Sequence, residues 1–181
     1  MQFLAKGKRG TVYIEGKCII KKASSYQIKN EVDWLKKLNK RKIGPKLVDY
    51  GEDWFKAEYI KGERIEEYVK RAEPKKITKS LKDCLKQCRV MDLLNMNKKE
   101  MHHPYKHVII RKNKPRFIDF ERCKITENPK NVTQFCQYIL KLSLIFKDKV
   151  NVDRDEMIKA MKEYKGAQTE SNFKKIVSFL I

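Results

Sequence analysis

Hydrophobic and polar positions in the first third of the chain form two strand-like pairs around one helical segment. The runs 11–15 (TVYIE) and 17–21 (KCIIK) are rich in β-branched and aromatic residues and meet at Gly16, which predicts a β-hairpin. Apolar residues then recur every three or four positions over 26–38, which is the period of an amphipathic helix. The run 46–60 alternates around a central Gly-Glu-Asp turn and predicts a second pair of strands.

The rest of the chain has mainly helical patterns. We expect a short polar helix at 63–71, a long helix from Thr78 as its N-cap to about Met96, strands at 107–110 and 116–120, and helices from about 129 onward. This order is not an alternation of strands and helices, so a doubly wound parallel sheet is disfavoured. The fold class expected is α+β.

Charge adds a second expectation. The 181 residues carry 43 Lys and Arg against 23 Asp and Glu, a net charge of +20. Most of the excess lies in residues 1–126, so we expect a polyanion near that part of the surface: nucleotide phosphates, RNA or an acidic protein. The alternative is a solvated, lysine-rich surface of the kind that accompanies growth at high temperature.

Two features of the composition exclude other classes of protein. No run of eighteen apolar residues occurs and the first residues lack the apolar core of a signal peptide, so we expect a cytoplasmic protein with no membrane partner. The five cysteines form no C-x-x-C pair, which argues against a disulfide framework and a zinc knuckle. Cys84 and Cys88 are therefore expected to be core residues.

A glycine-rich segment is the first candidate for chemistry. Residues 5–12 (AKGKRGTV) match G-x-G-x-x-G-x-V at three of its four defined positions, with Ala5 replacing the first glycine. The segment joins two strands rather than a strand and a helix, which favours a lid over nucleotide phosphates. Gly7 and Gly10 let the backbone approach the phosphates, and Val12 completes the motif. An ordinary hairpin that contains glycines is the alternative.

Charged residues follow at the spacing that a phosphate site needs. Lys21 ends an apolar strand, and Glu31 on the next helix would be its ionic partner and hold the ammonium at the α- and β-phosphates. Lys22 is the competing candidate, because adjacent strand residues face opposite sides. Asp119 follows a later apolar strand and is the expected Mg²⁺ ligand, with a buried capping Asp as the alternative.

Together these elements resemble a known family. The sequence resembles the small archaeal predicted Ser/Thr protein kinases, related to the RIO and Bud32 groups, over about residues 3–145. The motifs that carry the resemblance are Ile43–Glu52 (IGPKLVDYGE), Glu58–Gly62 (EYIKG), Lys106–Ile110 (KHVII) and Ile118–Glu121 (IDFE). It implies a protein-kinase-like bilobal fold. Residues 1–60 would form the N-lobe, a small antiparallel sheet with one helix, and residues 61–181 a reduced, mainly helical C-lobe with the catalytic loop and the metal-binding hairpin.

The resemblance also implies a ligand set. ATP and Mg²⁺, with Mn²⁺ as an alternative metal, would be the cofactors, and the main chain of Glu58 and Ile60 would contact adenine. Glu100 takes the place of the catalytic base, and His107 takes that of the second metal-binding residue. His102 and His103 are competing candidates for the base.

The motif set differs from that of an ordinary kinase in its later part. Glu121 replaces the glycine of D-F-G, and no A-P-E follows before the helix near Asn131, so the usual platform for peptide substrates is nearly absent.

The function expected is an ATP-dependent Ser/Thr protein kinase of minimal type that phosphorylates itself or a specific partner protein. The alternative is a catalytically weak ATP-binding or ATPase module that docks RNA or an RNA-processing assembly through its basic surface. A small-molecule kinase would need a longer C-lobe and ranks last.

Overall fold

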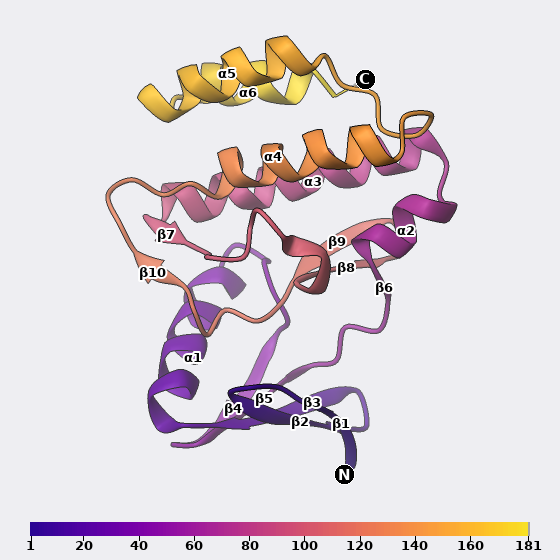
Figure 1. Ribbon diagram of the computed structural model, residues 1–181. Helices are drawn as coiled ribbons and strands as arrows, with labels where there is room; N and C mark the ends of the chain where they lie inside the picture. Colours follow the sequence, from indigo (N-terminus) through magenta and orange to yellow (C-terminus); the bar gives the residue numbers. More distant parts are fainter. Residues whose placement is uncertain (181) are drawn as a thin grey trace. The chain divides into compact units, whose positions relative to one another are not determined.

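The computed structural model describes residues 1–180, in which the chain forms two compact units. Unit 1 consists of Met1–Lys61 together with Arg116–Cys123, and unit 2 consists of Gly62–Pro115 together with the residues from Lys124 onward. Within the described residues there are a five-stranded antiparallel sheet and six α-helices (Figure 1). The predicted α+β class is confirmed.

The sheet of unit 1 contains both predicted strand pairs. Its strands are β1 (Gln2–Lys6), β2 (Gly10–Glu15), β3 (Cys18–Ala23), β4 (Leu47–Tyr50) and β5 (Trp54–Glu58), in the order β1-β2-β3-β5-β4. The β2–β3 hairpin turns at Gly16, whose φ of +61° is a left-handed conformation that favours glycine. Strand β1 was expected only as the strand that precedes the glycine-rich segment, and no range was predicted for it. All five of its residues are exposed, so no buried face marks it in the sequence.

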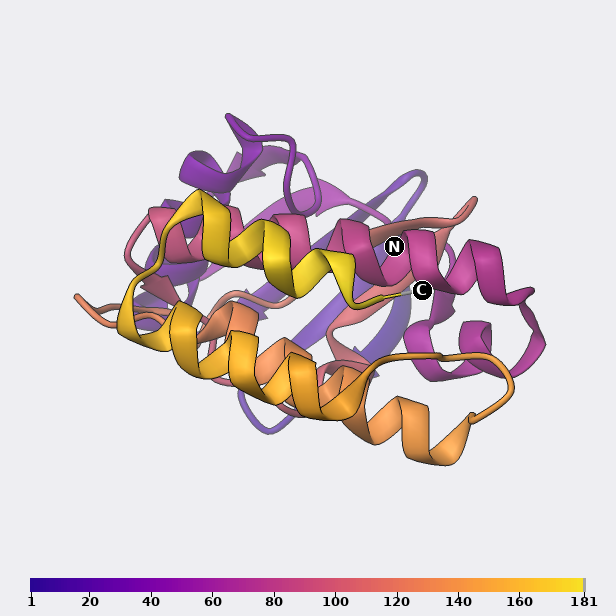
Figure 2. The ribbon, with the colours of Figure 1, turned by 90° about the horizontal axis from the view of Figure 1, so that it is seen from above.

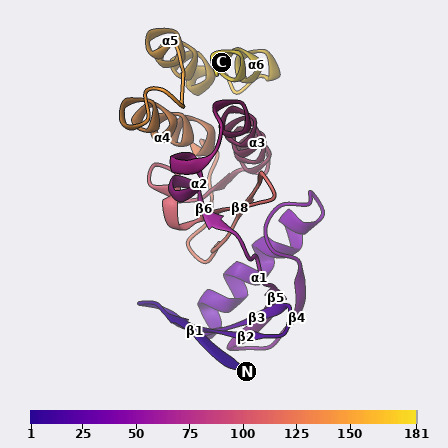
Figure 3. The ribbon, with the colours of Figure 1, turned by 90° about the vertical axis from the view of Figure 1, so that its right-hand side faces the viewer.

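One helix packs on this sheet, as predicted. Helix α1 (Ser25–Asn39) buries the apolar stripe Ile28, Val32, Leu35 and Leu38, and Figure 3 shows it lying alongside the strands. The segment Arg116–Cys123 adds the buried Phe120 to this core. A Cβ on Gly44 would lie 3.0 Å from the ring of Phe120, so glycine allows the close approach of the two.

Unit 2 is mainly helical. Helices α3 and α4 run side by side, and α5 and α6 pack together beside them (Figures 1 and 2). The helices of this unit are α2 (Ile65–Arg71), α3 (Pro74–Leu93), α4 (Asn131–Ile145), α5 (Arg154–Gly166) and α6 (Glu170–Ser178). Cys84 and Cys88 on α3 are buried, and all five cysteines of the chain are free, in agreement with a role as core residues.

The limits of two predicted helices were wrong. Helix α3 begins at Pro74 and not after Thr78, because proline at the first helical position has a suitable φ and lacks an N–H that would have no partner there. It ends at Leu93, and Met96 instead lies in β7 (Met96–Asn97), which pairs with β10 (Lys124–Ile125). Residues 63–64, predicted as helix, form the short strand β6 (Glu63–Arg64).

The second hairpin lies close to its predicted position. Strands β8 (Val108–Arg111) and β9 (Lys114–Phe117) join β6 in the order β6-β8-β9, and the 3₁₀ turn η1 (Pro104–Lys106) precedes them. Strand β9 ends at Phe117, three residues before its predicted end, so Asp119 lies beyond the strand. Among the helices of residues 1–180, none has the length and apolar character to cross a membrane.

Candidate functional site

Unit 1 holds a cluster of four charged side chains, Lys21, Glu31, Asp119 and Glu121, which we call the Lys21 cluster. Lys21 lies on β3 opposite Val12 of β2, and its side chain is 12% exposed. Its neighbour Lys22 is exposed to solvent. Strand alternation places the two lysines on opposite faces of β3, and in the structure Lys21 is the one that faces inward.

Three carboxylates surround the Lys21 ammonium. Its Nζ lies 2.7 Å from Glu31 Oε2, 2.9 Å from Glu121 Oε2 and 3.0 Å from Asp119 Oδ1. The ion pair predicted between Lys21 and Glu31 is present. Asp119 and Glu121 reach Lys21 because Arg116–Cys123 folds with the first 61 residues.

Glu31 links this ammonium to the segment that carries Asp119. Its second carboxylate oxygen accepts a 2.9 Å hydrogen bond from the backbone N–H of Phe120, and its side chain is 4% exposed. Burial raises the pKa of Glu31 above its ordinary value and the nearby Asp119 charge adds to the rise, whereas the Lys21 ammonium and the Phe120 amide oppose it. The contacts with Lys21 and Phe120 are the ones that favour the ionised carboxylate.

The balance of effects on Lys21 keeps it charged. Burial alone would lower the pKa of its ammonium, but the negative charges of Glu31, Asp119 and Glu121 outweigh burial and raise the pKa of Lys21 above its ordinary value. Lys21 is therefore a fixed cation at neutral pH.

Asp119 adopts an unusual backbone conformation. Its φ is +63°, in the left-handed region that non-glycine residues seldom occupy but that Asp and Asn tolerate best. Its side chain is 37% exposed, more than any other member of the cluster. A residue held in this conformation next to buried charges is typical of a functional site.

The Lys21 cluster also meets the first requirement of a cation site. One ligand atom each from Glu31, Asp119 and Glu121 lie within 4.8 Å of one another. Carboxylate oxygens are the ligands that Mg²⁺ prefers, so the residues fit the metal that the sequence led us to expect.

The glycine-rich segment forms the β1–β2 turn. The backbone N–H of Gly7 donates a 2.9 Å hydrogen bond to the carbonyl of Gly10. Arg9, at the tip of the turn, places Nη1 3.9 Å from Glu121 Oε1. The turn thus lies close to the Lys21 cluster within unit 1.

Substitution of Gly10 by Ala is expected to destabilise unit 1 by roughly 2 kcal/mol, because overpacking forces a backbone shift. A Cβ on Gly10 would lie 2.5 Å from the carbonyl oxygen of Lys22, so β2 and β3 would have to separate. Gly7→Ala is the matched control, since the nearest atom to its Cβ is 3.8 Å away. Urea unfolding of the two variants measures the difference, and equal stability would contradict it.

The two residues expected at adenine differ in their main-chain bonding. The N–H of Glu58 donates to the carbonyl of Lys46 at 2.8 Å, and its side chain lies 3.4 Å from Arg116. Ile60 is buried, and within residues 1–180 its N–H has no hydrogen-bond acceptor. Of the two amides, that of Ile60 is better placed to bind a ligand.

Glu100 and His107 belong to unit 2. Glu100 Oε2 lies 3.4 Å from the ammonium of Lys98, a side chain with no exposed surface. His107 is half-buried at the end of η1, where its N–H donates to the carbonyl of Pro104 at 2.8 Å. His102 and His103 are exposed and their rings lie 4.6 Å apart. Glu100 thus forms an ion pair with a fully buried lysine, Lys98.

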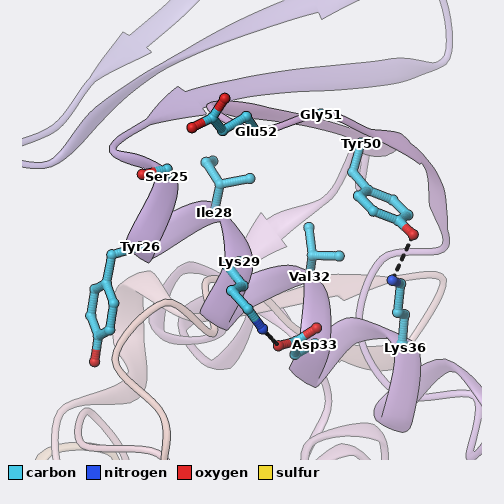
Figure 4. A pocket seen from close by; sticks show the side chains of 10 residues that line it. All are labelled: Ser25, Tyr26, Ile28, Lys29, Val32, Asp33, Lys36, Tyr50, Gly51 and Glu52. Atoms are coloured by element: carbon cyan, nitrogen blue, oxygen red, sulfur yellow. Dashed lines mark hydrogen bonds and ion pairs between the residues drawn. The ribbon is translucent and has the colours of Figure 1, made fainter.

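A separate cavity of about 560 Å³ lies between α1 and the β4–β5 turn (Figure 4). Ile28 and Val32 line it from the helix, and Lys36 on the same helix face bonds to the hydroxyl of Tyr50 on the opposite wall at 2.7 Å. Glu31 does not line this cavity. The cavity and the Lys21 cluster therefore use different faces of α1.

Sequence reasoning did not assign three residues that the structure connects to these sites. Glu121 was noted where a glycine is usual but not as a partner of Lys21, and its spacing of two from Asp119 was no guide because Asp119 is left-handed and Glu121 lies in a turn. Asn30 bonds the backbone of the same segment, and Lys98 pairs with Glu100. No sequence pattern marks either residue. The contact of Asn30 depends on the tertiary fold, and that of Lys98 lies in a loop without periodicity.

Comparisons with known proteins show a likeness in fold and none in sequence family. No protein-family model and no curated protein matches the chain. Solved structures match by fold, and among them is a co-crystal structure of WbdD with the kinase inhibitor LY294002. The TM-score is 0.63 at 14% sequence identity, over 98% of this chain and 44% of the WbdD chain, so the chain spans less than half the length of that protein. At this identity the likeness concerns the fold alone, and it supports a kinase-like fold for the described residues.

Proposed function

We propose that this chain is an ATP-dependent Ser/Thr protein kinase of minimal type, related to the small archaeal kinases that its sequence resembles, and that it phosphorylates itself or a specific partner protein. One observation carries the proposal. The buried Lys21–Glu31 ion pair is joined by Asp119, which lies 98 residues beyond Lys21 in the chain. A lysine beside phosphates and an aspartate that holds a metal are the two charged elements that phosphoryl transfer needs.

Each residue then has a role. Gly7, Gly10 and Val12 would cover the phosphates, Lys21 would bind them, and Glu31 would orient Lys21. The amide of Ile60 and the main chain of Glu58 would contact adenine. Mg²⁺ or Mn²⁺, held by Asp119 and helped by His107, would neutralise charge on the phosphates. The parts given to His107 and Glu100 rest on the sequence resemblance, because both residues lie in unit 2.

The reaction would be an in-line displacement. A hydroxyl oxygen of the acceptor protein attacks the γ-phosphorus, the bond from this phosphorus to the β-phosphate oxygen breaks, and ADP leaves. Glu100 accepts the hydroxyl proton. The remaining residues position the phosphates and stabilise charge, which is how most kinases accelerate transfer.

Incubation with γ-labelled ATP and Mg²⁺ or Mn²⁺ tests the proposal. The wild type should become labelled or label a partner, and Asp119→Asn and Glu100→Gln should each lower the rate about 100-fold. Asn tolerates the left-handed backbone of position 119, so the first variant should keep the fold. Asp83→Asn, a change of the same kind at a half-buried site on α3, is the control. Unchanged labelling in Asp119→Asn would refute the assignment, and free phosphate without labelled protein would indicate an ATPase.

A second candidate function is favoured by the surface of α3. Lys75, Lys79, Lys82 and Lys86 recur at intervals of four, three and four, which places them on one helix face. Three of them are exposed and Lys82 is partly so. This face, the α3 lysine face, would attract the phosphates of RNA, and the chain would then be a weak kinase-fold ATP-binding or ATPase module that docks RNA.

Replacement of the four lysines of the α3 lysine face by Gln is expected to weaken RNA binding and its dependence on salt. The slope of log K against log salt should flatten by about 3, because each lost contact with a single-strand phosphate removes roughly 0.7. Filter binding to tRNA and rRNA across a salt series measures it. Lys141, Lys162, Lys165 and Lys174, exposed on α4, α5 and α6, provide a charge-matched control. Equal slopes for both variants would exclude α3 as the docking face.

A further inference from the structure

Glu121 stands where the sequence pattern has a glycine, and it contacts Lys21 directly. We propose that Glu121 is a positioning residue: it holds Lys21 as a second counter-ion in the nucleotide-free protein, and the phosphates of a nucleotide must displace it. The distance between Lys21 Nζ and Glu121 Oε2 is 2.9 Å, close to the 2.7 Å of the Lys21–Glu31 contact. The Glu121 side chain is 10% exposed and that of Lys21 is 12% exposed, so both partners of this contact are largely shielded from solvent.

The backbone of the segment fixes this carboxylate in place. Asn30 Nδ2 on α1 donates hydrogen bonds to the carbonyls of Glu121 at 2.7 Å and of Cys123 at 3.2 Å. The Phe120 N–H donates to Glu31 on the same helix. Three hydrogen bonds therefore attach the segment to α1 on either side of Glu121, and its side chain emerges from a fixed main chain beside Lys21.

The charges of the cluster make Glu121 a competitor of phosphate. Glu31, Asp119 and Glu121 each place a carboxylate oxygen within 3.0 Å of the one Lys21 ammonium. Arg9 is 47% exposed and lies 3.9 Å from Glu121, so it offsets the charge of this carboxylate only weakly. A triphosphate that binds the Lys21 ammonium brings further negative charge close to these carboxylates. In a partly buried site the phosphates and the carboxylates repel each other strongly. With Glu121 present, the triphosphate should bind well only when a divalent cation accompanies it.

The first experiment needs no nucleotide. Lys21 acylation by an amine-reactive ester is followed by mass spectrometry in the wild type, Glu121→Gln, Glu121→Asp and the control Glu52→Gln, an exposed site in unit 1. Glu121→Gln removes one of the three carboxylates that hold the Lys21 ammonium, so the Lys21 nitrogen is released more readily from its ionic contacts and reacts with the ester about tenfold faster. Glu121→Gln should therefore label about tenfold faster, Glu121→Asp should return toward the wild type, and Glu52→Gln should match it. Equal rates in the wild type and Glu121→Gln would overturn the role of Glu121 at Lys21.

The second experiment rests on the proposed function and measures ATP affinity by calorimetry with Mg²⁺ and with a chelator. Glu121→Gln should bind metal-free ATP several-fold more tightly than the wild type and should depend less on Mg²⁺. Unchanged or weaker binding in Glu121→Gln would overturn the competition, and loss of the Mg²⁺-dependent binding would make Glu121 a metal ligand instead. If no variant binds ATP, the proposed function and the competition both fail, whereas the acylation rates still decide whether Glu121 holds Lys21.

Discussion

Lys21→Met should abolish measurable ATP binding and also lower the free energy of unfolding by roughly 3 kcal/mol, because removal of one partner of a buried ion pair leaves an uncompensated charge. Glu31 is 4% exposed and would lose its ammonium while keeping the Phe120 amide. Asp119 and Glu121 would lose the same cation. Methionine approximates the length of the lysine side chain, so the change removes the charge with little loss of packing.

Urea unfolding and ATP titration of the same variants separate the two effects. Lys22→Met is the control, since Lys22 is the adjacent residue on β3 and is exposed. It should change neither quantity. The double variant Lys21→Met/Glu31→Gln should recover part of the lost stability but not ATP binding, because it removes the buried carboxylate without restoring the cation. A stability of Lys21→Met within 0.5 kcal/mol of the wild type would contradict the buried ion pair, taking ~0.5 kcal/mol as the usual range for surface changes.

Local patterns predicted most of unit 1. The hairpin of β2 and β3 and the apolar stripe of α1 are each contained in fewer than twenty consecutive residues, so period and turn chemistry suffice to identify them. The choice of Lys21 over Lys22 was harder. It depended on the strand register, and the apolar residues Cys18–Ile20 did not fix that register without a motif for comparison.

The contacts that build the Lys21 cluster are distant in sequence, and this is why they were only partly predictable. Asp119 and Lys21 are 98 residues apart, and no local periodicity brings them together. The order of the motifs predicted that Lys21 and Asp119 belong to one site, through the resemblance to a family. It did not predict the contact of Glu121 with Lys21, because the family pattern has a glycine at that position and the contact exists only in the folded chain.

The ends of helices were also only partly predictable from local sequence. Pro74 lies between the predicted helix at 63–71 and the predicted start at Thr78, and in the structure it begins α3. A proline is compatible with the end of one helix and with the start of the next, and the packing of the following helix decides between them.

Asp92→Ala is expected to lower the free energy of unfolding by roughly 4 kcal/mol, because several buried donors would lose their acceptor at once. Asp92 is 2% exposed near the end of α3. Its Oδ1 accepts hydrogen bonds from the backbone N–H of Asn131 at 2.9 Å and from its side-chain amide at 2.8 Å. Its Oδ2 accepts from the Val132 N–H at 3.2 Å and the Tyr164 hydroxyl at 3.0 Å. One carboxylate thus joins α3, α4 and α5.

The position of Asp92 gives this loss a second cause. Asn131 and Val132 are the first residues of α4, where N–H groups have no partner inside the helix and the helix dipole favours a negative charge. Asp92→Asn keeps the shape but removes the charge and turns part of the acceptor into a donor, so it should lose less stability than Asp92→Ala. Asp83→Ala is the matched control, because Asp83 is a half-buried carboxylate on the same helix whose ionic partner is the exposed Lys86, and it should stay within ~0.5 kcal/mol of the wild type. Urea unfolding of the three variants tests the order, and an Asp92→Ala protein as stable as Asp83→Ala would show that α4 does not depend on this carboxylate for its N-terminal cap.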